Sequence, residues 1–372
     1  MTTFSPQQDE ALLAVSRWLK EAKRGKASQL FRLFGYAGTG KTTLARHIAE
    51  GVDGEVKFAA FTGKAAMMLR SKGCNDATTI HSLIYRSKTE DDTGTPSFSL
   101  NRQSDVKSAD LVVIDECSMV DEELGRDLLS FGTPVLVLGD PAQLPPVKGG
   151  GFFTETEPDV MLTEVHRQAQ DNPIIRLSMD IRAGERLELG TYGESRVMRR
   201  GDIGKEEMAN LVLGSDQVLV GRNKTRRDFN ARMRELMGRK DPMPVAGDKV
   251  VCLRNNKTKG LLNGATFTVK AVGKAKTGTV TMRLDPDDIS ALSVKVSVLP
   301  EYFLGQEETL PWQVRKESDE FDYGFALTVH KAQGSQWDKI VLFDESFAFR
   351  EHRERWLYTA VTRAAETITI VV

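Results

Sequence analysis

The sequence predicts an α/β protein built on parallel sheets, and three observations point to this class. The apolar run 30–34 is followed by the glycine-rich segment 35–42 and then by a helical pattern. A second apolar run, 111–114, ends in two carboxylates, Asp115 and Glu116. Strand-like and helical segments alternate again near the end of the chain, after a stretch of short strands. This order is typical of doubly wound sheets, which bind ligands at the carboxyl ends of their strands.

The composition is that of an ordinary soluble protein and excludes several classes. The 372 residues are 40% hydrophobic and 28% charged, with a formal net charge of −1, and the chain is long enough for two or three domains. The sequence contains neither an apolar stretch of membrane-spanning length nor a signal-peptide pattern at its start. Cys74, Cys117 and Cys252 lack metal-type spacing and predict reduced thiols in a cytoplasmic protein. The near-zero charge neither supports nor excludes nucleic-acid binding.

A helix is expected from residue 9 to about residue 22, before the glycine-rich segment. Ser5 is a suitable cap, Pro6 suits the first helical position, and apolar residues recur at helical spacing. Gln8 lies one helix ahead of the glycine-rich segment, where its amide could read an adenine edge. Taken alone, such a glutamine is also an ordinary surface residue.

The segment GYAGTGKT (35–42) fits the pattern G-x-x-x-x-G-K-[ST] between a strand and a helix. Glycines let backbone N–H groups turn toward a polyphosphate. Lys41 supplies a positive charge for the β- and γ-phosphates, and the Thr42 hydroxyl can complete a Mg²⁺ shell. A helix over 42–50 would then direct its dipole at the phosphates. The segment predicts a nucleoside triphosphate site formed by Gly35, Ala37, Gly38, Thr39, Gly40, Lys41, Thr42 and Thr43.

The carboxylates after the run 111–114 would lie beside this loop, because parallel strands end at one edge of the sheet. Asp115 is placed to hold Mg²⁺, and Glu116 could polarise the attacking water as general base. A simple strand end followed by a helix start at 118–121 fits the same residues and is compatible with both roles.

Two further loops leave predicted strands in the first half of the chain. Small polar residues follow the strand 56–61 and recur at 78–83. The strand 134–138 runs into a loop stiffened by prolines, which would present Asp140 and Gln143 in fixed positions. A glutamine there suits a γ-phosphate sensor, although the loop also fits a plain strand exit.

The polar segment 85–109 interrupts this pattern and predicts a projecting hairpin, with a turn at 91–94. The second half of the chain begins near residue 162. Its expected elements are a helix at 173–181, a strand at 217–220, a strongly basic helix at 225–239, an all-β insertion from 244 to about 312, and strands at 339–343 and 367–372.

In their order along the chain, these segments resemble the motifs of superfamily 1 helicases, in the 1B branch of RecD-like and Dda-like proteins. The matching segments are GYAGTGKTT, FTGKAA, TTIHSLI, VVIDECSM, GDPAQLPPV, LTEVHRQ, FALTVHKAQGSQ and WLYTAVTRA. They extend from about residue 5 to residue 363, so the resemblance covers nearly the whole chain. GDPAQLPPV and TVHKAQGSQ are the specific segments, because many unrelated ATPases share the first one.

The resemblance implies two RecA-like domains with ATP between them and single-stranded nucleic acid across both. The first domain is expected at 1–162, and the second at 163–243 together with 321–372. An SH3-like β-barrel is expected at 244–320, and the hairpin 85–109 corresponds to a pin that splits duplex DNA.

The family's motifs assign further roles to residues of this sequence. Gln8 is expected to contact adenine, and Gln143 to sense the γ-phosphate. Arg167 and Arg363 are expected to stabilise the transition state from the second domain. Gly334 and Gln336 are expected near the nucleotide, although related helicases carry a glutamate where Gln336 stands. The catalytic set is therefore Lys41, Asp115, Glu116, Gln143, Arg167 and Arg363.

A second set of residues matches family positions that touch DNA. Hydroxyl groups, histidine and lysine suit backbone and stacking contacts without sequence choice. The members are Thr62, Lys64, Thr79, His81, Thr328, His330 and Lys331, with Phe98 as a candidate wedge in the pin.

The resemblance predicts an ATP-dependent DNA helicase that moves along single-stranded DNA, with 5′→3′ polarity. ATP and Mg²⁺ are the expected cofactors, and DNA forks and replication or repair proteins are the expected partners of a monomer. One alternative is a translocase that unwinds poorly, and another is a motor subunit that acts only inside a larger complex. RNA is a third possible substrate, although no motif reads the 2′-hydroxyl.

Overall fold

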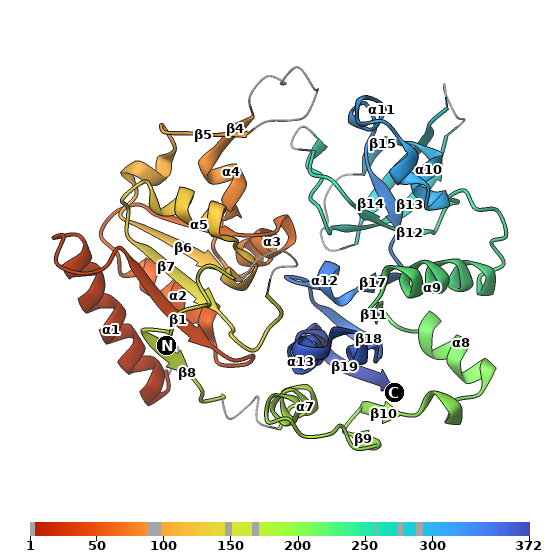
Figure 1. Cartoon of the computed structure of the whole chain (residues 1–372), viewed down its shortest axis with the longest axis horizontal. Coiled ribbons are helices and arrows are strands. Elements are labelled where there is room, and N and C mark those ends of the chain that lie inside the picture. Colours follow the sequence, from red (N-terminus) through yellow and green to blue (C-terminus); the bar gives the residue numbers. More distant parts are fainter. Residues whose placement is uncertain are drawn as a thin grey trace. The chain divides into compact units, whose positions relative to one another are not determined.

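The computed structural model describes residues 4–87, 98–145, 151–165, 171–256, 259–273, 278–287 and 293–372. These residues form two compact units (Figure 1). The first unit contains the described residues up to 186 together with 354–362, and the second contains 187–353 and 363–372.

A parallel sheet forms the centre of the first unit, with the strand order β3-β2-β6-β7-β1-β8. Its strands are β1 (Leu30–Gly35), β2 (Val56–Ala60), β3 (Thr78–Thr79), β6 (Leu111–Asp115), β7 (Val135–Gly139) and β8 (Val160–Leu162). The strands that carry the glycine-rich loop and the two carboxylates, β1 and β6, lie on either side of β7. The carboxyl ends of β1, β6 and β7 therefore meet at one edge.

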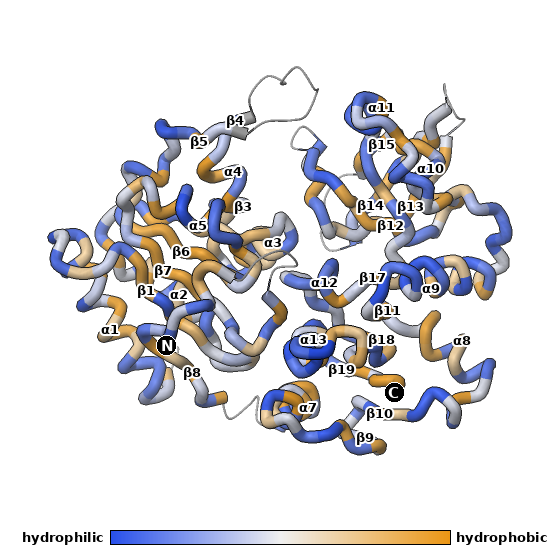
Figure 2. The backbone as a smooth tube through the Cα atoms, in the orientation of Figure 1, coloured by the Kyte–Doolittle hydropathy of each residue, from blue (hydrophilic) through white to orange (hydrophobic). Residues whose placement is uncertain are grey.

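Helices cover both faces of this sheet because successive strand residues point to opposite sides. Helices α1 (Pro6–Ala22) and α2 (Lys41–Glu50) pack on the face that includes Leu33 and Leu136. Helices α4 (Ile80–Ile84) and α5 (Glu122–Leu129) pack on the opposite face, against Val112 and Val137. Figure 2 shows hydrophobic colour along β1, β6 and β7 inside this unit. The alternation produces the two apolar layers of an α/β fold.

Side chains cap several helices at the loops that leave this sheet. Ser5 and Gln8 form a reciprocal capping box at the start of α1, and Pro6 occupies the first turn, as the sequence predicts. Thr62 caps α3 (Gly63–Ser71), and Thr79 caps α4. Each threonine oxygen accepts a hydrogen bond from a backbone N–H three residues later, which fixes the loop at the strand end.

A short antiparallel pair, β4 (Tyr85–Ser87) and β5 (Phe98–Leu100), projects from the first unit. The Tyr85 hydroxyl donates to the Asp127 carboxylate on α5 at 2.6 Å, which ties the base of the pair to the domain. Burial and this carboxylate raise the pKa of the Tyr85 hydroxyl. The predicted turn at 91–94 and the side chain of Phe98 lie outside the described residues.

The second unit contains a sheet in the order β17-β11-β18-β19-β10-β9, parallel except for β9. Its strands are β9 (Gly190–Tyr192), β10 (Ser195–Met198), β11 (Gln217–Val220), β17 (Ala326–Thr328), β18 (Trp337–Phe343) and β19 (Ala364–Val371). Helices α8 (Lys205–Leu213) and α9 (Asn223–Leu236) pack against it, and the short α12 (Val329–Ala332) follows β17. The predicted α/β class with parallel sheets is confirmed.

An antiparallel sheet completes the second unit, in the order β15-β14-β13-β12-β16. Its strands are β12 (Lys249–Cys252), β13 (Thr266–Val272), β14 (Val280–Pro286), β15 (Val294–Val298) and β16 (Phe321–Tyr323), with the short helices α10 (Pro300–Leu304) and α11 (Trp312–Lys316) between the last two. One apolar cluster joins its inner face to the parallel sheet, for example through Val250, Phe321 and Val218. The two sheets of this unit thus share a core.

Buried polar contacts hold α9 against both of these sheets. Arg226 pairs with Asp322 on β16 at 2.6 Å. The Asn230 amide donates to and accepts from the backbone of Ala326 on β17. Arg234 donates to both carboxylate oxygens of Asp248. Part of the positive charge of this helix therefore serves structure.

In the part of the chain that the structure describes, every helix is too short or too polar to cross a lipid bilayer.

Candidate functional site

The glycine-rich loop runs from the end of β1 to the start of α2, and its shape requires glycine. Gly38 and Gly40 have φ values of +79° and +78°, which favour glycine strongly. A Cβ atom on Gly35 would lie 2.6 Å from the Thr39 Oγ1 and 2.8 Å from the Leu162 Cβ. The backbone is thus folded tightly at the point where α2 begins.

Lys41 begins α2, and its ammonium group is held over the loop that precedes it. Its Nζ donates to the carbonyl oxygen of Gly35 at 2.7 Å and to that of Tyr36 at 3.0 Å. These bonds place a positive charge beside the N-terminus of α2, where the helix dipole also favours an anion. The loop therefore has the geometry and charge of a phosphate-binding site.

Thr42 and Asp115 meet at the edge of the sheet. The Thr42 hydroxyl donates to the Asp115 Oδ2 at 3.1 Å. Burial and the neighbouring Glu116 carboxylate raise the pKa of the Asp115 carboxyl, while the Lys41 ammonium opposes the rise. A hydroxyl and a carboxylate are oxygen donors of the kind that Mg²⁺ takes, so the pair fits a divalent cation.

Glu116 directly follows β6 and has an unusual backbone conformation. Its φ is +53°, in the left-handed region that residues other than glycine seldom adopt. Its N–H donates to the Asp115 Oδ1 at 2.9 Å, and the residue caps the short 3₁₀ helix Cys117–Met119. Strained residues of this kind cluster at functional sites, which agrees with the predicted role of Glu116 as general base.

The loop after β7 brings Asp140 and Gln143 to the same edge. Asp140 is buried, and burial raises the pKa of its carboxyl, against the opposing effects of Lys41 and of the Tyr358 hydroxyl. The Gln143 side chain is also buried, and its amide oxygen accepts no hydrogen bond from any described residue. A buried amide oxygen without a donor suits a group that meets a ligand or water.

Tyr358, on α13 (Arg353–Val361), bridges two of these loops. Its hydroxyl donates to the Asp140 Oδ2 at 2.6 Å and accepts from the backbone N–H of Ala37 at 2.9 Å. The backbone N–H of Leu144 donates to the neighbouring Thr359 hydroxyl at 2.9 Å. The sequence reasoning missed Tyr358, and its position inside the segment WLYTAVTRA was the available signal.

Gln8 contacts the glycine-rich loop directly. Its amide nitrogen donates to the carbonyl oxygen of Thr39 at 3.0 Å, and its amide oxygen accepts from the Ser5 N–H at 3.0 Å. Both ends of the amide therefore bind protein groups, and the adenine contact stays a prediction. The structure places this glutamine against the glycine-rich loop.

Three of the remaining predicted nucleotide residues, Gly334, Gln336 and Arg363, belong to the second unit. Arg363 is buried there, and its guanidinium donates to the carbonyl oxygen of Ser335 at 3.3 Å. Gly334 adopts a φ of +72°, and Gln336 is exposed. Their roles at a nucleotide stay predictions. Arg167 lies outside the described residues.

The predicted DNA-contacting residues form one local arrangement in each unit. Thr79 caps α4 after the edge strand β3, and the ring of His81 contacts Phe61 and Tyr85. Thr328 caps α12 after the edge strand β17, and the ring of His330 contacts Phe349.

Each unit therefore presents a capping threonine and, two residues later, a histidine against an aromatic ring. Thr62 caps α3, the Lys64 side chain is buried, and Lys331 lies exposed on α12. The two Thr-x-His segments lie far apart in the chain, so their common geometry becomes visible only in the structure.

Family models match two separate parts of the chain. An AAA domain model matches residues 14–202, and a UvrD-like helicase C-terminal domain model matches residues 323–371. The ATP-dependent RecD2 DNA helicase of Deinococcus radiodurans is 28% identical over 362 residues, which cover 91% of this chain and 46% of that relative. The ATP-dependent DNA helicase Dda of Enterobacteria phage T4 is 31% identical over 193 residues, which cover 48% of this chain and 42% of Dda.

Solved structures of Pif1 helicases have the same fold. A structure of two coordinating Pif1 helicases at forked DNA has a TM-score of 0.60 at 19% identity and covers 99% of this chain and 92% of the Pif1 chain. Candida albicans Pif1 has a TM-score of 0.54 at 18% identity and covers 100% of this chain and 94% of that chain.

The chain spans less than half the length of the curated relatives it matches. The AAA domain model nevertheless covers about half of the chain, and the helicase C-terminal model follows it in order. The chain therefore belongs to this AAA domain family, among the superfamily 1 helicases of the RecD-like and Dda-like branch.

Proposed function

We propose that this chain is an ATP-dependent DNA helicase that moves along single-stranded DNA, with 5′→3′ polarity. The observation that carries the proposal is the contact between Thr42 and Asp115 at the mouth of the glycine-rich loop, with Glu116 next to it. RecD2 and Dda, which this chain resembles along its motifs, are named ATP-dependent DNA helicases.

In the proposed reaction, water attacks the γ-phosphorus of ATP, the bond from this atom to the β–γ bridging oxygen breaks, and ADP and inorganic phosphate are released. The backbone N–H groups of the loop and the Lys41 ammonium would hold the phosphates, and Thr42 and Asp115 would hold Mg²⁺. When bound, the ion neutralises charge on the phosphate oxygens. The Glu116 carboxylate accepts a proton from the attacking water, and the Gln143 amide orients that water beside the γ-phosphate.

Two arginines complete the proposed catalytic set. Arg363 and Arg167 would stabilise the negative charge that spreads over the γ-phosphate oxygens in the transition state. Gly334 and Gln336 are proposed to lie near the nucleotide, and Gln8 near the adenine. Delivery of an arginine when ATP binds is a route by which hydrolysis can drive movement.

We propose that single-stranded DNA binds to the two Thr-x-His turns, at 79–81 and 328–330. The hydroxyl groups of Thr79 and Thr328 suit backbone contacts, and the imidazoles of His81 and His330 offer flat surfaces to bases. Thr62, Lys64 and Lys331 are assigned to the same strand. These groups read no base edge, so the binding is expected to be independent of sequence.

The domain assignments are part of the same proposal. Residues 1–162 would be the first RecA-like domain, and 163–243 with 321–372 the second. The segment 244–320 would be an SH3-like barrel, for which the antiparallel order of β12 to β15 gives support. The hairpin 85–109 would act as the pin, with Phe98 as wedge.

The first test is the ATPase rate with and without single-stranded DNA, for the wild type and for Glu116→Gln. We expect strong stimulation by DNA and a loss of about 100-fold or more in the variant, because the base is removed. Glu123→Gln, an exposed glutamate on α5, is the matched control and should behave as wild type. A wild-type rate that neither DNA nor RNA raises would overturn the stand-alone motor.

Unwinding and direction need a second test with tailed duplexes. We expect the protein to unwind a duplex with a 5′ tail and to leave one with a 3′ tail intact. Replacing 88–97 by a short glycine-serine link should abolish unwinding while the DNA-stimulated ATPase remains, because the pin would act only on duplex. An unchanged unwinding rate would contradict the role of the pin, and ATPase without unwinding in the wild type would favour the translocase or motor-subunit alternative.

A further inference from the structure

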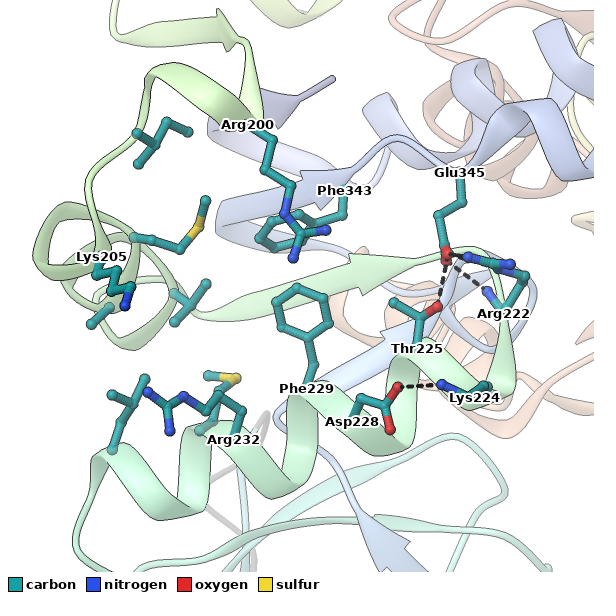
Figure 3. A pocket seen from close by; sticks show the side chains of 16 residues that line it. Arg200, Lys205, Arg222, Lys224, Thr225, Asp228, Phe229, Arg232, Phe343 and Glu345 are labelled. Carbon is teal, nitrogen blue, oxygen red and sulfur yellow. Dashed lines mark hydrogen bonds and ion pairs between the residues drawn. The ribbon is translucent and has the colours of Figure 1, made fainter.

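A pocket of about 650 Å³ lies in the second unit, away from the residues assigned above. It is lined by the 3₁₀ helix Arg200–Asp202, by α8, by one side of α9 and by the end of β18. Figure 3 shows its side chains pointing toward one another from these elements. None of the proposed nucleotide or DNA residues is among its lining residues.

The floor of the pocket is apolar. The rings of Phe229 and Phe343 pack against each other there, with centroids 4.3 Å apart and planes at 40°. Aliphatic side chains from α8 and α9 surround the rings, including Met208, Val212 and Leu236, of which Leu236 is 36% exposed. Such a floor is suited to apolar side chains that enter from outside.

The rim of the pocket is positively charged. Five cationic side chains and two carboxylates line it, and Figure 3 labels them. Both carboxylates are already engaged, Asp228 with Lys224 at 3.2 Å and Glu345 with Arg222 at 2.6 Å. The lining cations are Arg200, Lys205, Arg222, Lys224 and Arg232.

Two of these cations have no carboxylate partner among the described residues, namely Arg200 and Lys205. The exposed Arg200 guanidinium lies 6.0 Å from the centre of the Phe343 ring, and the exposed Lys205 begins α8. Acidic groups at this rim could form ion pairs with Arg200 and Lys205 without breaking an existing ion pair. The pocket is thus complementary to a negatively charged occupant with an apolar part.

We infer that this pocket binds a short segment of a partner protein in which acidic residues alternate with leucine or phenylalanine. The apolar side chains would fill the floor beside Phe229 and Phe343, and the carboxylates would meet Arg200 and Lys205. A nucleic-acid strand fits less well, because the Phe229 and Phe343 rings pack against each other and Phe343 is only 4% exposed, which leaves little flat surface for a base to stack on. The inference goes beyond the proposed motor activity and does not depend on it.

The probe is a fluorescein-labelled peptide of sequence Asp-Leu-Asp-Phe-Asp-Leu-Asp, whose binding is followed by fluorescence anisotropy. We expect saturable binding to the full chain, weakened by salt, and at least about tenfold weaker binding to the double variant Arg200→Glu/Lys205→Glu. The matched control is Arg283→Glu/Lys295→Glu. It reverses the charge of two exposed cationic residues that lie opposite each other on the neighbouring strands β14 and β15. It should bind the peptide as the wild type does.

The apolar half of the site is tested separately. Leu236→Ser should weaken peptide binding severalfold, whereas Leu189→Ser, at an exposed leucine outside the pocket, should leave it unchanged. The ATPase rate of the Arg200→Glu/Lys205→Glu variant should equal that of the wild type, because neither residue belongs to the proposed motor site. That equality shows that any loss of peptide binding is local.

Three results would overturn the inference. The first is equal binding of the peptide by the wild type and the Arg200→Glu/Lys205→Glu variant. The second is equal binding of a peptide in which asparagine replaces every aspartate, which would remove the role of charge. The third is a combination of two observations: the peptide fails to bind the wild type, and the Arg200→Glu/Lys205→Glu variant loses the wild-type affinity for oligothymidylate. That combination would assign the pocket to nucleic acid.

Discussion

The Thr42 hydroxyl donates to the Asp115 carboxylate at 3.1 Å, although 73 positions separate the two residues in the chain. The contact arises because β1 and β6 run parallel on either side of β7 and end at the same edge. Two oxygen-bearing side chains from distant segments therefore meet beside the glycine-rich loop, at the strand ends where doubly wound sheets bind their ligands.

Removing either ligand should raise the Mg²⁺ requirement of the ATPase. For Asp115→Asn, we expect the Mg²⁺ concentration at half-maximal rate to rise roughly tenfold or more, because a charged oxygen ligand becomes neutral. The measurement is a Mg²⁺ titration of the ATPase at saturating ATP. Asp105→Asn, at an exposed aspartate, is the control, and an unchanged titration curve for Asp115→Asn would show that the ion lies elsewhere.

Tyr358→Phe should weaken both the fold and the ATPase. The change leaves the Ala37 N–H and one oxygen of the buried Asp140 without their partner, at a cost of about 1–3 kcal/mol in the free energy of unfolding. Urea unfolding and ATPase assays measure the two effects. The control is Tyr192→Phe, because the Tyr192 hydroxyl is exposed and donates to the Glu188 carbonyl oxygen. This control should change neither the free energy of unfolding nor the ATPase rate. A Tyr358→Phe protein as stable and as active as the control would contradict the bridging role.

The two imidazoles of the Thr-x-His turns should support DNA binding without charge. Desolvation lowers the pKa of both His81 and His330, which favours the neutral form of the two rings. We expect His330→Ala to weaken binding of single-stranded DNA roughly five- to hundredfold through lost stacking. The slope of log affinity against log salt should stay constant, because no cation is removed. A reduced slope would show that the histidine is protonated on DNA, and His47→Ala is the control.

Asp248→Asn should destabilise the second unit strongly. This fully buried carboxylate accepts from Arg234, from Arg239 at 2.6 Å and from the Val245 N–H. Neutralising it leaves two guanidinium groups without their anion, at about 3–5 kcal/mol in the free energy of unfolding. Glu235→Gln, which removes an exposed ion pair, should cost less than about 1 kcal/mol. Similar unfolding curves for the two variants would argue against this role.

The Cys252 thiol should resist alkylation in the folded protein. Burial raises its pKa to about 12, so the reactive thiolate is scarce even at pH 9. In the unfolded chain the thiol ionises near its ordinary pKa, so raising the pH above 9 favours unfolding. Mass spectrometry after iodoacetamide treatment should find Cys252 unmodified in native protein and modified in urea. Rapid labelling of the native protein at pH 8 would contradict the burial.

Local patterns were sufficient to predict the nucleotide loop. The glycine positions, the capping Ser5 and the carboxylates after β6 are each set by neighbours in the chain, so the sequence indicates them directly. The bridge from Tyr358 to Asp140 and Ala37 was beyond such reasoning, because three distant segments create it. Only packing decides which hydroxyl reaches that carboxylate.

The basic helix α9 is a second case in which contacts between distant segments could not be predicted from the sequence. The sequence predicts only a strongly basic helix here, whereas the structure shows that Arg226 and Arg234 are buried in ion pairs with Asp322 and Asp248. Asp322 lies on β16, and Asp248 directly precedes β12, so both partners belong to the antiparallel part of this unit. Hydropathy alone places an arginine outside, and the carboxylate that stabilises it inside becomes visible only in the fold.

The internal position of β19 constrains the order in which the protein can fold during synthesis. All strands of the first sheet have been made by residue 162, whereas β19, between β18 and β10, is made only at 364–371. Until then the edges of β10 and β18 are unpaired and can template pairing with another chain. A ribosome that pauses shortly before residue 364 would therefore expose an aggregation-prone intermediate, and this stretch of translation is where a chaperone would help most.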